Sequence, residues 1–212
     1  MSTATGLRER KKQRTREAIA QTAWHLFAER GFDHVPVAEV AREADVSEAT
    51  VFNYFPTKED LVFHRMEAFE HELLGAARDR DRDESIVQAF AGFVLKPRGF
   101  LGSDDPEASE GLRTVARVMT SSPALMTRQR EILEGYTSSL AAVIAQELGM
   151  ASDDVEPWVV ANALIGVHRA LIAYTHRQAL AGIENRRIAR NLKQHGRRAL
   201  ALLEEGVGQA AV

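Results

Sequence analysis

The chain has 212 residues, of which 45% are hydrophobic and 27% are charged, and it contains no cysteine. This length suits one large or two small domains and is sufficient for a substantial hydrophobic core. Without cysteine the protein has no disulfides, thiolate metal sites or cysteine nucleophiles, which is typical of the reducing cytoplasm. We therefore expect a cytoplasmic protein.

The net charge of −3 is unevenly distributed along the chain. Residues 1–16 contain six basic side chains and a single acidic one, so this segment carries +5 and the remainder carries −8. A basic arm on an acidic body favours contact with a polyanion at the arm, although a solvated tail that aids solubility explains the same composition. No continuous apolar run follows the arm, so it does not have the pattern of a secretory signal peptide.

Apolar spacing predicts helices through most of the first part of the chain. The four helices expected there span residues 15–30, 37–44, 47–55 and 58–80. Gly31 is a helix stop, Asp45 tolerates the left-handed conformation of a tight turn, and Ser47 is placed to cap the third helix. The charged run over 79–84 is polar on all sides and marks a boundary between two regions.

The second region also has helical spacing, and we find no run with the alternation of a strand. Its expected helices span residues 85–95, 112–120, 123–148, 154–180 and 185–205. A loop rich in Gly, Pro and acidic residues is expected over 96–111. The apolar stretch 158–174 is interrupted by Asn162, His168 and Arg169, so we expect a buried helix rather than a membrane span. The predicted fold is all-α, with about nine helices.

The two short helices over 37–55, joined by a tight turn, form a predicted helix-turn-helix, whose second helix enters the major groove of DNA. On that helix Val51 and Phe55 face inward. The exposed side then holds Glu48, Ala49, Phe52 and Asn53. Asn pairs bidentately with adenine, Ala and Phe contact a thymine methyl, and Glu accepts from cytosine N4. The donors suited to phosphate oxygens are Thr50, Tyr54 and Lys58. A generic helical corner that packs its aromatic side chains is the alternative.

Four segments occur in a characteristic order and spacing: RTREAI at 14–19, LFAERGFD at 26–33, VAEVA at 37–41 and VSEATVFNYFPTKEDL at 46–61. Together they resemble the N-terminal domain of TetR-family transcriptional regulators. The resemblance covers residues 10–65 and implies a homodimeric, ligand-responsive regulator, most often a repressor, on a palindromic operator. It also implies that a small molecule in a larger helical domain moves the fourth helix and releases the DNA.

The resemblance carries the DNA-contacting role to particular positions. These are Arg14, Arg16, Val37, Ser47, Glu48, Ala49, Thr50, Phe52, Asn53, Tyr54 and Lys58. Two positions depart from the family pattern, because Pro36 replaces a Thr or Ser before the second helix and Phe52 replaces a Tyr. The implied organisation is a basic arm over 1–14, a DNA-binding domain over 15–57, a connecting helix over 58–84 and a ligand-binding and dimerisation domain over 85–212.

The second region is expected to hold the ligand and the dimer interface. Candidates for lining a largely apolar cavity are Phe90, Phe93, Met119, Met126, Tyr136, Asn162, His168 and Arg169. Candidates for the interface are Trp158, Ala161, Ile165, Ile172, Leu192 and Leu200. Ordinary core packing is the alternative for each of these residues. Arg169 suits an anionic ligand or an acidic partner such as Asp154 or Glu156.

Metal binding and catalysis are not expected, and neither is a cofactor. His64, Glu67 and His71 have a spacing that suits a metal, but the segment is highly charged and favours a solvated face. The sequence has no Gly-rich phosphate loop, no HExxH motif and no nucleophile elbow. The rival to a regulator is a non-catalytic helical protein-interaction module, which leaves the exposed residues of the third helix unexplained.

Overall fold

The computed structural model describes residues 3–103, 105, 107–151 and 153–210, with side chains from Arg8 to Glu205. Across these residues the chain forms ten α-helices and two short 3-10 helices, without a strand, which confirms the predicted all-α class. The first two residues of the predicted arm lie outside the described part. The chain divides into two compact units, Met1–Met66 with Val118–Met126, and Glu67–Arg117 with Thr127–Val212.

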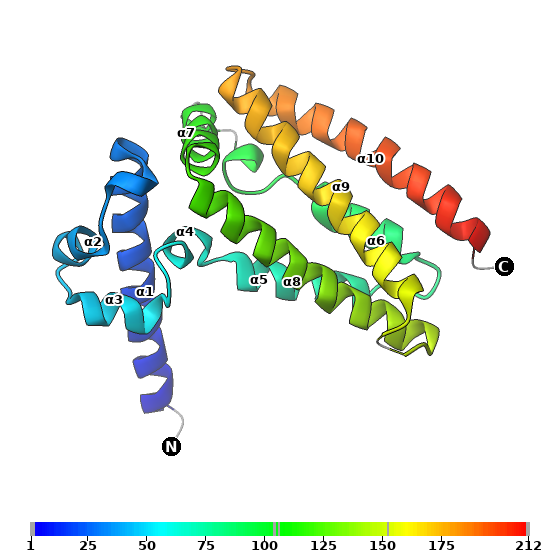
Figure 1. Ribbon diagram of the computed structural model, residues 1–212, viewed down its shortest axis with the longest axis horizontal. Helices are drawn as coiled ribbons and strands as arrows, with labels where there is room; N and C mark the ends of the chain where they lie inside the picture. The colour runs from blue at the N-terminus through cyan, green and yellow to red at the C-terminus, as the bar shows by residue number, and fades with distance from the viewer. Residues whose placement is uncertain (1–2, 104, 106, 152, 211–212) are drawn as a thin grey trace. The chain divides into compact units, whose positions relative to one another are not determined.

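The first unit is built on one long helix. Its elements are α1 (Thr3–Arg30), η1 (Phe32–His34), α2 (Val37–Glu43), α3 (Glu48–Tyr54) and α4 (Asp60–Phe63). The shorter helices group beside α1 (Figure 1). Apolar residues from all of them are buried together, among them Phe27, Val40, Val51, Phe55 and Leu61. The unit is therefore a small helical core that fixes the position of α3.

Two boundaries in the first part of the chain differ from the prediction. Helix α1 begins at Thr3, not at residue 15, so the basic arm is helical from there on. Straight-chain Arg, Lys, Glu and Gln side chains lose little freedom in a helix, and Gln13 donates to Glu17 at 2.9 Å. The predicted fourth helix is divided in two, because the His64 ring donates to the carbonyl of Leu61 (3.1 Å) where the next helical N–H would bond.

The second unit is an assembly of longer helices. Its elements are α5 (Met66–Arg78), α6 (Ile86–Val94), η2 (Gly99–Gly102), α7 (Ala108–Ser121), α8 (Pro123–Leu148), α9 (Val155–Leu180) and α10 (Asn185–Ala210). Helices α9 and α10 lie antiparallel and side by side (Figure 1), joined by a turn in which Gly182 has φ of 75°. The predicted loop over 96–111 contains η2 and the first turn of α7. Asn185 at the start of α10 donates to the Phe100 carbonyl (2.8 Å) and holds η2 in place.

Helix α9 differs from the expected buried helix. It is long and apolar enough to cross a membrane, by length and composition, yet only 22% of its most apolar stretch is buried within the chain. Its exposed large apolar side chains are Val155, Trp158, Val159 and Leu180. The helix therefore presents an apolar surface that this chain does not cover by itself.

Candidate nucleic-acid interface and effector region

Helix α3 has two chemically different sides. Val51 and the C-cap residue Phe55 are each 1% exposed, whereas the Phe52 side chain is 46% exposed. The other exposed residues of this helix are Glu48, Ala49 and Asn53. The structure therefore presents these four predicted base-reading side chains together to solvent, and a large exposed aromatic ring beside an amide is suited to a DNA groove.

The turn before α3 is the one predicted. Asp45 has φ of 54°, the left-handed conformation, and the Ser47 side chain accepts from the Thr50 backbone N–H at 3.1 Å. The Ser47 and Thr50 hydroxyls are also hydrogen-bonded to each other at 2.8 Å. The cap fixes the start of α3 and holds both hydroxyls at its N-terminus, where phosphate oxygens bind well.

Lys58 is more deeply engaged than a simple phosphate contact requires. Its Nζ donates to the Phe32 carbonyl (2.6 Å) and lies 4.2 Å from the centre of the Phe32 ring. Burial lowers the pKa of the Lys58 ammonium, which the Asp33 carboxylate partly offsets. An ammonium has three N–H donors, so those that do not bond Phe32 remain for a phosphate.

The start of α2 lacks a side-chain cap, as the presence of proline there predicts. Pro36 is the N-cap with φ of −73°, and no side chain bonds the first turn. An ion pair between Arg30 and Glu39 (2.5 Å) ties α2 to α1 instead, and its hydrogen bond lowers the pKa of Glu39. Val37, in the first turn, is half-buried.

The basic residues of α1 divide into two kinds. Arg8, Arg10, Lys11, Lys12 and Arg14 are exposed. Arg16 is half-buried, and its guanidinium lies 5.5 Å from the centre of the Phe55 ring. Arg16 therefore links α1 to the end of α3, which places a cation next to the predicted DNA-reading helix.

The junction of α7 and α8 belongs to the first unit. Ser122, which is 1% exposed, donates to the Asp33 carboxylate at 2.7 Å, and its Oγ accepts from the Leu125 backbone N–H at 3.4 Å. The Asp33 carboxylate in turn acts electrostatically on Lys58, where it partly offsets the lowering of the pKa by burial. Ser122 therefore bonds to a residue whose charge acts on Lys58, which was predicted to contact phosphate.

In the second unit, aromatic side chains gather around Phe69. Its ring centre lies 5.1 Å from Phe93, 5.9 Å from Tyr136 and 5.4 Å from His168, with the last two rings stacked on it. The Arg98 guanidinium lies 3.9 Å from the Phe93 ring centre and donates to the Phe93 carbonyl at 2.6 Å. We call these five residues the Phe69 cluster.

Burial sets the ionisation of the Phe69 cluster. It lowers the pKa of His168 to about 4, with a smaller contribution from the Arg98 charge, so the imidazole is neutral at pH 7. Burial also raises the pKa of Tyr136, helped by the Glu70 carboxylate. The cluster therefore offers stacked neutral rings and one guanidinium, which suits an apolar or aromatic ligand body.

The structure separates the predicted ligand residues. Only Phe93, Tyr136 and His168 join the Phe69 cluster. Phe90 lies in the core, and Met119 and Met126 belong to the first unit. The Asn162 amide donates to the Trp158 carbonyl within α9 (2.8 Å), and both Asn162 and Arg169 are exposed. Phe69 and Arg98 were not predicted as ligand residues, because nothing in their local spacing sets them apart.

The predicted interface residues also divide. Ala161, Ile165, Leu192 and Leu200 are buried inside the chain, and so offer no surface to a partner. Ile172 is half-buried, and Trp158 is 38% exposed on α9. The exposed positions Val155, Val159 and Leu180 were missed: Val155 and Leu180 lie outside the apolar stretch 158–174, and Val159 lies inside it without a spacing that marks it as exposed.

The three residues whose spacing suits a metal do not lie on one helix. His64 falls in the interruption between α4 and α5, whereas Glu67 and His71 are exposed residues of α5. Burial lowers the pKa of His64. Among the described residues no group of three His, Asp or Glu is placed to hold a metal ion.

A small helical unit that presents an exposed reading helix after a tight turn defines a helix-turn-helix DNA-binding protein. Two protein-family models match the chain and indicate the same class of protein. Residues 19–64 match the model described as bacterial regulatory proteins, tetR family, and residues 101–208 match the MftR C-terminal domain. The chain belongs to the TetR family of transcriptional regulators.

Two curated relatives of the chain are named as regulators. TcmR of Streptomyces glaucescens is 29% identical over 151 residues, covering 70% of this chain and 67% of that protein. The putative mycofactocin biosynthesis regulator MftR of Mycobacterium tuberculosis is 27% identical over 167 residues, covering 79% and 81%.

Solved structures share the fold at low sequence identity. The SmeT–triclosan complex has a TM-score of 0.58 at 18% identity, covering 91% of this chain and 90% of that one. FadR of Bacillus subtilis in complex with stearoyl-CoA has a TM-score of 0.54 at 17% identity, covering 88% and 96%.

Proposed function

We propose that this regulator is a cytoplasmic homodimeric repressor that binds a palindromic operator through α3 and is released by a small molecule held in the second unit. The observation that carries the proposal is the exposed side of α3, where Phe52 and Asn53 face solvent while Val51 and Phe55 are buried. Asn53 suits bidentate pairing with adenine, and Phe52 suits a thymine methyl. The ring of Phe52 lacks the hydroxyl of a Tyr, so its contribution is apolar.

The uncovered side of α9 supports a homodimer. Val155, Trp158, Val159 and Leu180 are exposed large apolar residues on one helix. A soluble chain rarely leaves such a helix uncovered, and a two-fold partner covers it with the same surface. Two copies of α3 related by a two-fold axis read two inverted half-sites, which makes the operator palindromic.

The Phe69 cluster supports a largely apolar effector. Its neutral His168 and Tyr136 avoid the cost of burying charge, and its Phe69 and Phe93 rings are apolar and only half-buried. Two proteins of similar fold are described with triclosan and with stearoyl-CoA, both of which have apolar bodies. Arg98 is the one cation of the cluster and suits a polar group at one end of such a molecule.

A route from effector to DNA is provided by the α7–α8 junction. Both helices lie mostly in the second unit, but residues 118–126 belong to the first. A shift of these helices acts on Asp33 through Ser122, and Asp33 interacts with Lys58. Effector binding therefore changes the position of a phosphate-contacting residue without touching α3.

Operator binding is tested by fluorescence anisotropy against duplexes that tile the DNA around the gene, at two salt concentrations. We expect one near-palindromic duplex to bind tightly, and Asn53→Ala to weaken that binding by about 1–3 kcal/mol, or roughly 5- to 150-fold. Each neutralised phosphate contributes a slope of about −0.9 in log affinity against log salt. Gln146→Ala, which removes an exposed amide from α8, is the matched control.

The proposal would be contradicted if the protein bound every duplex equally weakly and Asn53→Ala did not change that binding. An interaction module would then be favoured.

Sedimentation tests the dimer separately. Trp158→Glu is expected to give a monomer with weak operator binding, because it places charge in the apolar surface of α9. A wild-type monomer at micromolar concentration would refute both the dimer and the palindrome.

A further inference from the structure

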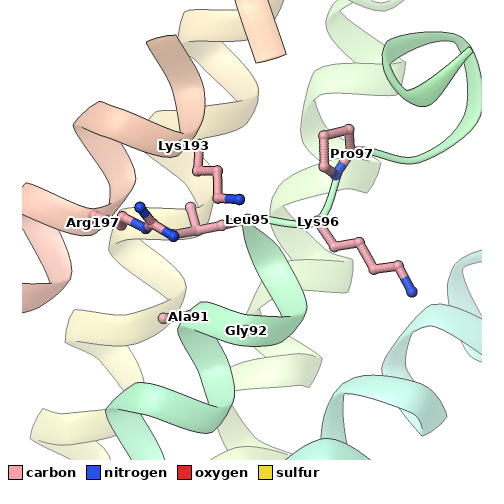
Figure 2. A pocket seen from close by; sticks show the side chains of 7 residues that line it. All are labelled: Ala91, Gly92, Leu95, Lys96, Pro97, Lys193 and Arg197. Carbon is pink, nitrogen blue, oxygen red and sulfur yellow. The ribbon is translucent and has the colours of Figure 1, made fainter. Parts of the chain in front are cut away.

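A hollow of about 380 Å³ lies between α6 and α10 (Figure 2). Its apolar part is formed by Ala91, Leu95 and Pro97, and its charged part by Lys193 and Arg197 of α10. In Figure 2 both α10 side chains extend toward Leu95, whereas Lys96, also at the rim, points away from α10. The volume lies within the range of small-molecule sites, roughly 300–1,000 Å³. We call this feature the α6–α10 groove.

Two glycines create the α6–α10 groove. A Cβ at Gly196 would lie 2.2 Å from Leu95 Cδ2, so the glycine lets α10 approach the end of α6 closely. A Cβ at Gly92 would meet no atom within 4 Å, so the absence of a side chain there leaves the space open. The hollow is therefore a product of the packing of the two helices.

The two α10 cations of the groove are not paired with an acidic side chain among the described residues. Lys193 and Arg197 form no ion pair within the described part of the chain. Helix α10 carries six Lys and Arg residues over 186–198 and no acidic residue there, although the chain outside its basic arm has a net charge of −8. Uncompensated cations at the mouth of an apolar hollow favour an anion that carries an apolar portion.

We infer that the α6–α10 groove binds a small phosphate-bearing ligand, with its phosphate between Lys193 and Arg197 and its apolar portion on Leu95 and Pro97. A guanidinium offers a planar pair of donors to a phosphate, and an ammonium adds a compact charge. The groove shares no residue with the Phe69 cluster. This site is additional to the proposed operator and effector sites and does not depend on them.

A nucleic acid is the less suitable occupant. The charged face continues along α10 through Arg190, Gln194 and Arg198, but the surface there is formed by one helix alone. The partly open hollow lined by two segments of the chain lies where Lys193 and Arg197 meet residues of α6 and the segment after it. A concave, partly apolar space selects a small molecule, whereas a duplex requires a long open charged surface.

Isothermal titration calorimetry of the full chain tests the site with three probes: ADP, octyl phosphate and inorganic pyrophosphate. We expect ADP or octyl phosphate to bind saturably and more tightly than pyrophosphate. ADP binding indicates a nucleotide-like ligand, and octyl phosphate binding indicates a lipid-like one. Lys193→Gln with Arg197→Gln is expected to weaken that binding about tenfold or more, because two charge-assisted contacts are lost.

Two further variants separate the site from general charge effects. Gly92→Leu fills the hollow without removing a charge and is expected to weaken binding about as much as the double substitution. Arg186→Gln with Arg187→Gln removes the same charge from the same helix, outside the groove, and is expected to change affinity by less than about twofold. Circular dichroism verifies that each variant is folded. If Gly92→Leu does not fold, the two double substitutions decide the test.

Three results would overturn the inference. The first is no saturable binding of any probe. The second is an equal loss of affinity in the two double substitutions, which identifies a diffuse charge effect. The third is pyrophosphate binding as tight as that of both organic probes.

A short duplex of unrelated sequence is titrated in parallel. If Lys193→Gln with Arg197→Gln weakens only the binding of the duplex, the cations contact DNA and the inference is wrong. Operator affinity of the variants reports on the proposed function separately.

Discussion

The two compact units differ in how directly the sequence reveals their functional residues. In the first unit, the predicted inward residues of α3 are buried and the predicted reading residues are exposed. The ligand residues predicted for the second unit are spread over its core, the exposed side of α9 and the Phe69 cluster, and two of them, Met119 and Met126, belong to the first unit. The difference arises because a reading helix is specified by local spacing, whereas a ligand region is assembled from helices that are distant in the sequence.

The largest expected effect tests the division of α3 into two sides. Phe55→Ala is expected to lower the free energy of unfolding by about 3–5 kcal/mol, because it leaves a cavity in a well-packed core. Urea denaturation followed by circular dichroism measures this change. Phe52→Ala is the matched variant on the exposed side and is expected to change the free energy of unfolding by less than about 0.5 kcal/mol.

In operator binding, the larger specific effect is expected from Phe52→Ala, the variant with little effect on stability. Phe52→Ala weakens operator binding while the protein stays folded, since the ring faces solvent and is available to a groove. If Phe52→Ala destabilises the protein as much as Phe55→Ala does, both rings pack in the core. The helix-turn-helix assignment would then lose its main structural support.

A second, smaller effect tests close packing in the other unit. Gly196→Ala is expected to lower the free energy of unfolding by about 1–3 kcal/mol, because the added methyl group overlaps Leu95. Gly92→Ala on α6 is the control and is expected to raise stability by about 0.5–1 kcal/mol, since its methyl group meets open space in a helix. Changes of the same sign would show that α6 and α10 are not held together at Gly196.

The Phe69 cluster predicts a pH dependence of stability that originates in the second unit. The pKa of His168 is about 4 in the folded chain against an ordinary 6.5, so the unfolded chain binds an additional proton between these values. Stability therefore falls as the pH falls through this window, by about 2 kcal/mol from pH 7 to pH 5 for this group. Urea denaturation at both pH values measures the loss.

His168→Gln removes this dependence while keeping a polar side chain of similar length. Between pH 7 and pH 5 the free energy of unfolding of the variant is expected to fall by about 2 kcal/mol less than that of the wild type. His64 and His176 have lowered pKa values as well, so a residual dependence of the same sign remains. Identical losses in the two proteins would mean that the His168 imidazole is not buried against Phe69.

The helix class, the tight turn at Asp45 and the caps were predictable because each depends on a few consecutive residues. The sequence did not reveal that the His64 ring ends α4, because that bond competes with helix propensity within a highly charged segment. It also did not reveal the placement of Arg98, which reaches Phe93 from a loop. Such contacts depend on the path of the chain between elements, and residue spacing carries no information about that path.

The smallest expected effect concerns a feature that both units share. Ser47 caps α3 by accepting from the Thr50 N–H, and Ser85 forms a capping box with Gln88 at the start of α6. Replacement of either serine by Ala is expected to cost about 1 kcal/mol in the free energy of unfolding, because an N–H of the first turn loses its partner. Urea midpoints of the two variants measure both costs.

The two serine variants separate once DNA is added. Ser47→Ala also removes a hydroxyl from the N-terminus of the proposed reading helix and is expected to weaken operator binding, whereas Ser85→Ala is expected to leave operator affinity unchanged. Ser47→Thr keeps both the cap and the hydroxyl, so it restores stability and binding together. If Ser85→Ala weakened operator binding as much as Ser47→Ala, operator affinity would follow overall stability. The hydroxyl beside α3 would then have no role in DNA recognition beyond that of a helix cap.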